Sequence, residues 1–268
     1  MDQRIFEKFR TLIYERSGIA LNQGKETLVA ARLGKRMRLL GLADYKDYYQ
    51  YVLDHERQGE VSLLLDAIST NFTSFFREPD HFDLLRAQAR QWVEAGQQRL
   101  RIWSAACATG EEPYSMAIVL QEICQGHDCD LKILATDISV RALELAYAGV
   151  YDLERVEPIA PELRRRYLEE VDTEVGTGYR VRDELRALVV FKRLNLSKPP
   201  LPLRGPMDII FCRNVMIYFD NIVRQKLIDE AYRLLKPGGY LVVGHSESLK
   251  GVSGHFRVVG PSVYVKEL

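Results

Sequence analysis

Apolar side chains recur at helical spacing through about residues 1–75. They fall three or four positions apart, with no strand-like alternation between the helical stretches. Gly18 and Gly41 suit helix ends, and Asp44 suits a helix start. The pattern predicts a small all-α N-terminal domain over residues 1–75, with helices over residues 5–18, 25–41, 43–55 and 60–70.

The pattern changes from about residue 99. Short apolar runs occupy residues 100–106, 131–137, 188–196, 207–212 and 239–246, and helical stretches lie between them. Strand runs separated by helical runs are typical of βαβ units in a mostly parallel sheet. The tail, 256–268, predicts two strands joined at Gly-Pro, an antiparallel edge hairpin. We therefore expect an α/β domain over residues 76–268.

One connection is longer than the fold requires. About 58 residues separate Asp137 from Asn195, whereas a whole βαβ unit needs only about 30. Within this gap Gly176 and Gly178 favour a turn, and the segment that follows them alternates like a strand. We expect a small β-subdomain inserted at about residues 160–190.

Composition excludes several classes of protein. Lys plus Arg and Asp plus Glu each number 37, so no global charge attracts nucleic acid or anionic lipid. The four cysteines form no CxxC pair, which argues against a zinc knuckle and a disulfide framework. The chain starts MDQRIFEKFR, unlike a signal peptide, and no run is apolar enough to span a membrane. These features predict a cytoplasmic protein.

Candidate ligand-binding residues follow the predicted strands, because open α/β sheets bind ligands at the carboxyl ends of their strands. Asp137 could accept hydrogen bonds from ribose hydroxyls or cap the next helix. Asn195 could frame a nucleobase or simply form a turn. The strand at 207–212 leads directly into Arg213 and Asn214, which puts two polar groups at the ligand edge. The small residues before Pro113 fit either a close ligand approach or a tight turn.

Six motifs together resemble the CheR family of chemotaxis receptor methyltransferases. They are NFTSFFRE (71–78), SAACATGEEPYS (104–115), TDIS (136–139), RLNL (193–196), FCRNVMIYF (211–219) and LKPGGYLVVGHSES (235–248). The resemblance implies a class I, Rossmann-like S-adenosylmethionine methyltransferase domain with an N-terminal helical domain and an inserted β-subdomain. It also implies that the enzyme methylates glutamate carboxylates of membrane chemoreceptors, releasing S-adenosylhomocysteine.

The resemblance assigns roles to individual residues. It implies that Arg77 and Tyr218 are the pair nearest the transferred methyl. It also implies that Glu111 lies near the methionine ammonium and that Asp137 holds the ribose. The cofactor contacts that it implies are Asn71, Thr73, Arg77, Glu111, Asp137, Asn195, Leu196, Arg213 and Asn214. The five histidines show no HxxxH or HxH spacing, so we assign no metal and expect only a structural hydrogen bond from His245.

The second predicted helix has one cationic face. Its apolar residues share an arc of roughly 80°, and the basic residues occupy the other side. A solvated surface, a nucleic-acid contact and a docking surface for an acidic helix all fit this pattern. The zero net charge disfavours nucleic acid, and the family's substrates are Glu-rich receptor helices. We therefore expect receptor docking at Arg32, Lys35, Arg36 and Arg38.

The leading hypothesis is a protein-glutamate methyltransferase recruited to membrane receptor arrays. The inserted β-subdomain is a candidate site for a receptor tail peptide. A methyltransferase for another acceptor, such as RNA or a different signalling protein, is the alternative within enzymes. A module that binds cofactor or receptor without catalysis is the alternative outside them, and the intact Arg77, Asp137 and Tyr218 disfavour it.

Overall fold

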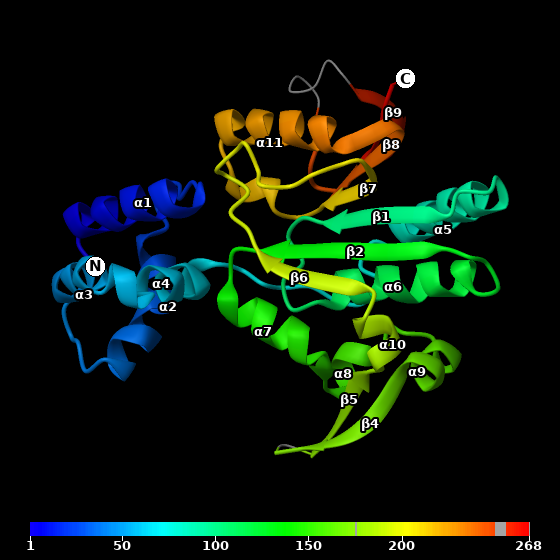
Figure 1. Ribbon diagram of the computed structural model, residues 1–268. Helices are drawn as coiled ribbons and strands as arrows, with labels where there is room; N and C mark the ends of the chain where they lie inside the picture. Colours follow the sequence, from blue (N-terminus) through cyan, green and yellow to red (C-terminus); the bar gives the residue numbers. More distant parts are fainter. Residues whose placement is uncertain (175, 250–255, 268) are drawn as a thin grey trace.

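The N-terminal part of the chain folds into four α-helices that lie beside the rest of the molecule (Figure 1). The computed structural model describes residues 1–174, 176–249 and 256–267. The helices are α1 (Gln3–Ser17), α2 (Glu26–Leu39), α3 (Tyr45–Asp54) and α4 (Glu60–Ile68), with a 3-10 turn at Glu56–Gln58. Asp44 caps α3 as predicted, accepting a hydrogen bond from the Lys46 N–H. Phe9, Leu33 and Leu64 are fully buried in the core that the helices enclose.

A seven-stranded sheet forms the larger part, in the order β6-β2-β1-β7-β8-β10-β9. The first five strands in this order are parallel, whereas β10 is antiparallel to both of its neighbours. The predicted mostly parallel sheet with an antiparallel edge hairpin is therefore confirmed. The strands are β1 (Arg99–Ser104), β2 (Asp130–Asp137), β6 (Val189–Arg193), β7 (Met207–Cys212), β8 (Leu235–Val243), β9 (Phe256–Gly260) and β10 (Val263–Lys266).

Helices bury both faces of this sheet. Successive residues of β7 separate into two cores, with Ile209 and Phe211 in one and Ile210 and Cys212 in the other. Both faces of the parallel strands are therefore buried, which explains why their sequences are unbroken apolar runs. The first core packs under α5 (Pro79–Glu94), α6 (Glu111–Cys124) and α7 (Val140–Ala148), and the second under α11 (Asn221–Leu234).

The long connection between β2 and β6 holds a second, three-stranded sheet. Its order is β3-β5-β4, all antiparallel. Its strands are β3 (Val150–Tyr151), β4 (Leu168–Thr173) and β5 (Gly176–Val181), and short helices α8 (Leu153–Val156), α9 (Pro161–Tyr167) and α10 (Asp183–Arg186) accompany them. The insertion thus begins near residue 150, before the expected 160. Gly178 lies inside β5 and not at a turn, and part of the turn, residue 175, lies outside the described residues.

The helical part and the sheet part meet along the segment that follows β7. The Ala20 N–H donates to the Tyr218 carbonyl at 2.8 Å, and the Tyr14 hydroxyl donates to Asp220 at 2.6 Å. Gly18 (φ 74°) lies so close to Ser197 that a Cβ there would come within 2.4 Å of the serine side chain. The contact therefore holds the four helices against the carboxyl edge of the sheet. Among the described residues, no helix is both long enough and apolar enough to cross a membrane.

Candidate functional site

A cavity of about 350 Å³ lies where the helical part meets the carboxyl ends of β1, β2 and β7. Residues from both parts line it, including Ile19 and Leu28 on the helical side and Ala105 and Ala108 on the sheet side. Nine of the residues predicted for the cofactor or the chemistry line it: Asn71, Thr73, Arg77, Asp137, Asn195, Leu196, Arg213, Asn214 and Tyr218. Motifs far apart in the sequence therefore meet in one place.

Asp137 lies at the end of β2 and is buried in the cavity wall. Its two carboxylate oxygens accept hydrogen bonds from the backbone N–H groups of Ala108 and Ser139, each at 2.9 Å. Burial raises the pKa of Asp137, while these N–H groups oppose the shift. Ser139 caps α7 by accepting from Ala142, so the alternative reading of Asp137 as the helix cap is wrong.

Arg213 is the most completely enclosed charge in the cavity wall. Its guanidinium donates to Glu112 at 3.1 Å and Glu78 at 3.0 Å, and also to the Arg77 carbonyl. The guanidinium packs 5.6 Å and 5.4 Å from the ring centroids of Phe82 and Phe211. Because every side of the group is held, Arg213 fixes the backbone turn that carries Arg77.

Arg77 is half-buried, whereas Arg213 is buried. Its guanidinium donates to the Phe72 carbonyl at 3.1 Å and lies 5.8 Å from the Phe72 ring centroid. The turn around it is sharp, with Phe76 and Glu78 in left-handed conformations at φ 53° and 57°. Tyr218 ends a 3-10 helix (Met216–Tyr218) and is half-buried on the cavity wall. Both residues line the cavity.

The prediction for Glu111 does not fit the structure. Glu111 is fully buried outside the cavity, where its carboxylate pairs with Arg155 at 2.7 Å and accepts from Thr109 at 2.7 Å. Its neighbour Glu112 lines the cavity instead, accepting from Ser104 at 2.6 Å. Successive helix residues point about 100° apart, so a one-residue difference in helix phase decides which carboxylate faces the cavity. Burial raises the pKa of Glu112, and Arg213 opposes that shift.

The Asn195 side chain makes its hydrogen bonds within the protein. Its oxygen accepts from the N–H and hydroxyl of Ser197, and its amide donates to the Arg16 carbonyl at 2.8 Å. The turn that the sequence allowed is therefore present, and it also joins α1 to the sheet. Asn195 and Leu196 still form part of the cavity wall.

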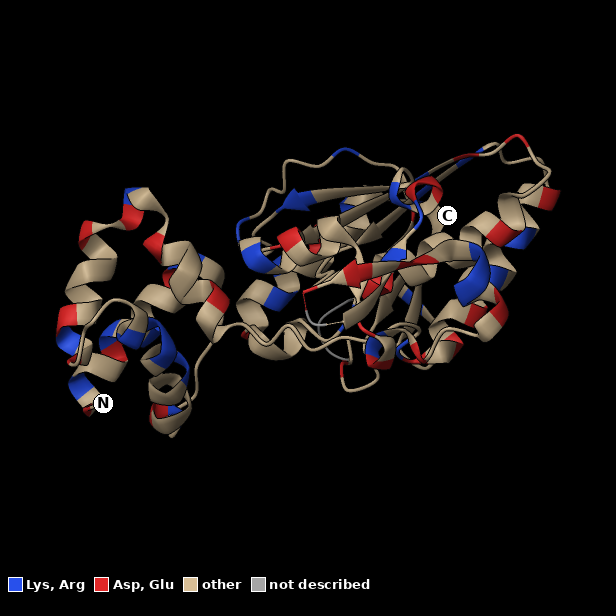
Figure 2. Cartoon of the chain, turned by 90° about the horizontal axis from the view of Figure 1, so that it is seen from below, with Lys and Arg blue, Asp and Glu red and all other residues tan. Residues whose placement is uncertain are grey.

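The cationic face of α2 is narrower than predicted. Arg36 binds the buried Glu60 through two hydrogen bonds of 2.9 Å and 2.6 Å, so it is not free for docking. Arg32 lines the cavity and donates to the Ile68 carbonyl and to Thr70, the latter at 2.8 Å. Lys35 and Arg38 remain exposed on the helix. Figure 2 shows that the helices of the N-terminal part carry both basic (blue) and acidic (red) positions.

Comparisons with known proteins place the chain in a family. Residues 4–69 match the family described as "CheR methyltransferase, all-alpha domain", and residues 71–265 match "CheR methyltransferase, SAM binding domain". The chain is 43% identical to "Chemotaxis protein methyltransferase 2" of Pseudomonas aeruginosa, covering 97% of this chain and 91% of that protein. It is 39% identical to "Chemotaxis protein methyltransferase" of Escherichia coli, covering 97% and 89%.

The described structure and these matches lead to the same assignment. Two family matches, one after the other, cover the helical part and the sheet part, and the second is a domain that binds S-adenosylmethionine. The cavity lies between the two parts, at the edge of the sheet where such a ligand binds. The chain belongs to the CheR methyltransferase family.

Proposed function

We propose that this protein transfers the methyl group of S-adenosylmethionine to glutamate carboxylates of membrane chemoreceptors. The observation that carries the proposal is that one cavity, lined by both parts of the chain, gathers Asp137, Arg213, Arg77 and Tyr218. Asp137 would accept from the ribose hydroxyls and Glu112 would face the methionine ammonium. Asn71, Thr73, Asn195, Leu196, Arg213 and Asn214 would complete the cofactor pocket.

The chemistry requires positioning more than proton transfer. A glutamate carboxylate has a reference pKa of about 4.3, so at neutral pH it is already a nucleophile. Its attack on the sulfonium methyl forms an ester C–O bond, breaks the S–CH3 bond and converts two charged groups into two neutral ones. A site screened from water favours this loss of charge, and in-line alignment of the two reactants lowers the barrier further. Arg77 would orient the acceptor carboxylate, and Tyr218 would pack or donate a hydrogen bond beside the methyl.

The acceptor would reach the cavity across the helical part. Lys35 and Arg38 are two exposed cations that an acidic helix could contact. Arg32, on the same helix, lines the cavity. The proposal divides the chain into a docking domain (1–75) and a catalytic domain (76–268). The small sheet β3-β5-β4 remains a candidate site for a receptor tail peptide, and binding there would bring the enzyme to receptor arrays.

An acceptor comparison tests the proposal. Labelled S-adenosylmethionine is mixed with the enzyme and with membranes bearing chemoreceptors, the same membranes without receptors, or total RNA. Label in the receptor band alone is expected. Label in RNA, or in membranes lacking receptors, would favour another acceptor. Cofactor binding without transfer to any acceptor would favour the non-catalytic alternative.

The two adjacent glutamates give a prediction about the cofactor. Glu112→Gln is expected to weaken binding of S-adenosylhomocysteine about 10- to 150-fold, the range for losing a charge-assisted hydrogen bond. Glu111→Gln should leave the affinity unchanged. Both changes should lower stability, because Arg155 and the buried Arg213 each lose a carboxylate partner. Calorimetric titration and thermal unfolding of both variants measure these effects. If Glu111→Gln weakened binding and Glu112→Gln did not, Glu111 would be the cofactor contact.

The basic face of α2 gives a prediction about the receptor. Changing Lys35 and Arg38 together to Ala is expected to raise the receptor KM about 2- to 30-fold, because exposed charge contacts are individually weak. The effect should shrink between about 20 and 300 mM salt as screening grows. Lys46 and Arg57, also exposed in the helical part, provide a matched double-alanine control. Equal KM values for the two double variants would make the α2 face an ordinary solvated surface.

A further inference from the structure

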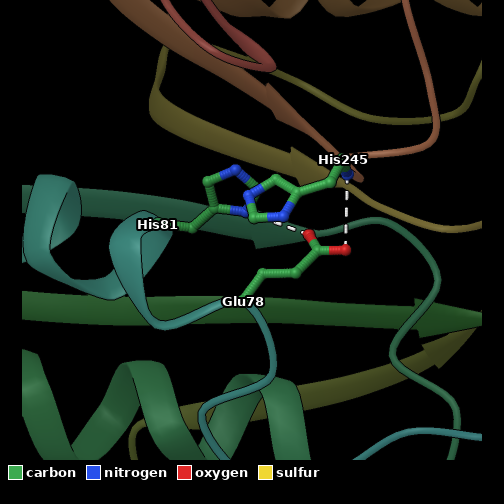
Figure 3. A group of neighbouring side chains, drawn as sticks. All are labelled: Glu78, His81 and His245. Atoms are coloured by element: carbon green, nitrogen blue, oxygen red, sulfur yellow. Dashed lines mark hydrogen bonds and ion pairs between the residues drawn. The ribbon is translucent and has the colours of Figure 1, made fainter.

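Two histidines far apart in the sequence lie side by side next to the cavity wall. His81 is in the first turn of α5, and His245 follows β8. Their ring centroids are 4.8 Å apart, and Figure 3 shows both rings above the Glu78 carboxylate. The fold brings them together, so their spacing in the sequence forms no metal-binding motif.

His81 has buried ring nitrogens that lack hydrogen-bond partners. The residue is fully buried, and neither nitrogen makes a hydrogen bond within the described structure. Its Nδ1 lies 3.3 Å from a Glu78 oxygen, and its Nε2 lies 3.8 Å from an Asp80 oxygen. Polar atoms buried in this way are rare in proteins, and a bound ion or water commonly completes them. Nε2 is therefore available to a ligand that lies between His81 and Asp80.

The two distances from Asp80 to the histidines are close to those between the ligands of a metal ion. The Asp80 oxygen that faces His81 lies 3.0 Å from Nε2 of His245. Ligand atoms bound at about 2.0–2.1 Å around a tetrahedral zinc ion lie about 3.3 Å apart. The 3.0 Å and 3.8 Å separations fall on either side of this value, and the side chains of His245 and Asp80 are half-exposed and free to adjust. Among the described residues, Glu78, His81 and His245 also form a group whose ligand atoms lie within 4.8 Å of one another.

Glu78 suits a supporting role in such a site. Its carboxylate already binds the Arg213 guanidinium at 3.0 Å and the His245 backbone N–H at 3.3 Å, which makes it a poor direct ligand. Its position beside Nδ1 of His81 lets it accept that N–H and leave Nε2 as the free lone pair. Carboxylate–histidine pairs of this kind orient most metal-binding histidines in proteins.

We propose that His81, His245 and Asp80 bind a divalent transition-metal ion of the zinc class, with Glu78 orienting His81. The ion would join the start of α5 to the segment after β8, beside the turn that carries Arg213 and Asn214. Three protein ligands leave one tetrahedral position for water. The proposal concerns binding and stability, and it does not depend on the identity of the methyl acceptor.

Zn²⁺ titration of the full-length, chelator-treated protein tests the site. Calorimetry is expected to show one ion bound per chain, and Co²⁺ in its place should give the intense visible absorption of a tetrahedral site. His245→Ala and Asp80→Asn change half-exposed side chains and should leave the fold intact. Each should weaken Zn²⁺ binding at least about 10-fold. Zn²⁺ should raise the thermal unfolding midpoint of the wild-type protein, with a smaller rise in these variants.

His127→Ala is the control, because His127 is exposed between two partly buried cysteines that could themselves bind zinc. This variant should bind Zn²⁺ as the wild type does. The proposal is overturned if the wild-type protein binds no stoichiometric ion. It is equally overturned if His245→Ala binds as tightly as the wild type, or if His127→Ala is the variant that loses binding.

Discussion

Replacing Arg77 with Ala is expected to lower the single-turnover rate of methyl transfer about 100-fold, the cost of a displaced reactant in an aligned reaction. Tyr218→Phe should lower the same rate while leaving affinity for S-adenosylhomocysteine nearly unchanged, since it removes one hydroxyl beside the cavity. Rapid mixing at saturating cofactor separates the chemical step from binding. Because Arg77 also lines the cavity, we expect Arg77→Ala to lose some affinity for the cofactor as well.

Arg86→Ala is the matched control for Arg77. Arg86 lies on α5, where it pairs with Asp83 at 2.6 Å on the exposed side of the helix, and it is absent from the cavity wall. Its variant should keep the wild-type rate. Wild-type single-turnover rates in both Arg77→Ala and Tyr218→Phe would remove these two residues from the reacting centre.

Asp137→Ala should weaken binding of S-adenosylhomocysteine about 10- to 150-fold, because a buried carboxylate that accepts from hydroxyls contributes a charge-assisted hydrogen bond. The same change leaves the N–H groups of Ala108 and Ser139 without their acceptor, so the unfolding midpoint should also fall. Calorimetry well below that midpoint keeps the two effects apart. Asp137→Asn retains an acceptor oxygen and should show the smaller loss of stability. An unchanged dissociation constant in both variants would leave Asp137 a structural residue only.

Local patterns were enough to predict the fold. Apolar spacing separates the four N-terminal helices from the sheet, and unbroken apolar runs mark strands that are buried on both faces. The position of Asp137 at a strand end also followed from local sequence, because the carboxyl edge of a parallel sheet is where open α/β folds bind ligands.

Side-chain direction and tertiary pairing could not be predicted in the same way. Glu111 and Glu112 differ by one helical step, and only the start of α6 after Gly110 decides which of them faces the cavity. Arg36 has the periodicity of a surface cation, yet the buried Glu60 of a different helix binds it. The closeness of His81 and His245 arises from the packing of α5 against the sheet, which sequence spacing does not encode.

The measurement that tests the central claim most directly is the chemical nature of the bond formed on the receptor. Receptor labelled from methyl-tritiated S-adenosylmethionine is treated with alkali, and volatile radioactivity is collected. A carboxyl methyl ester hydrolyses to methanol, so the account predicts that most of the label becomes volatile and that the Arg77→Ala enzyme yields little. Label that stays with the protein after alkali would identify a stable amine or other adduct and contradict glutamate methylation.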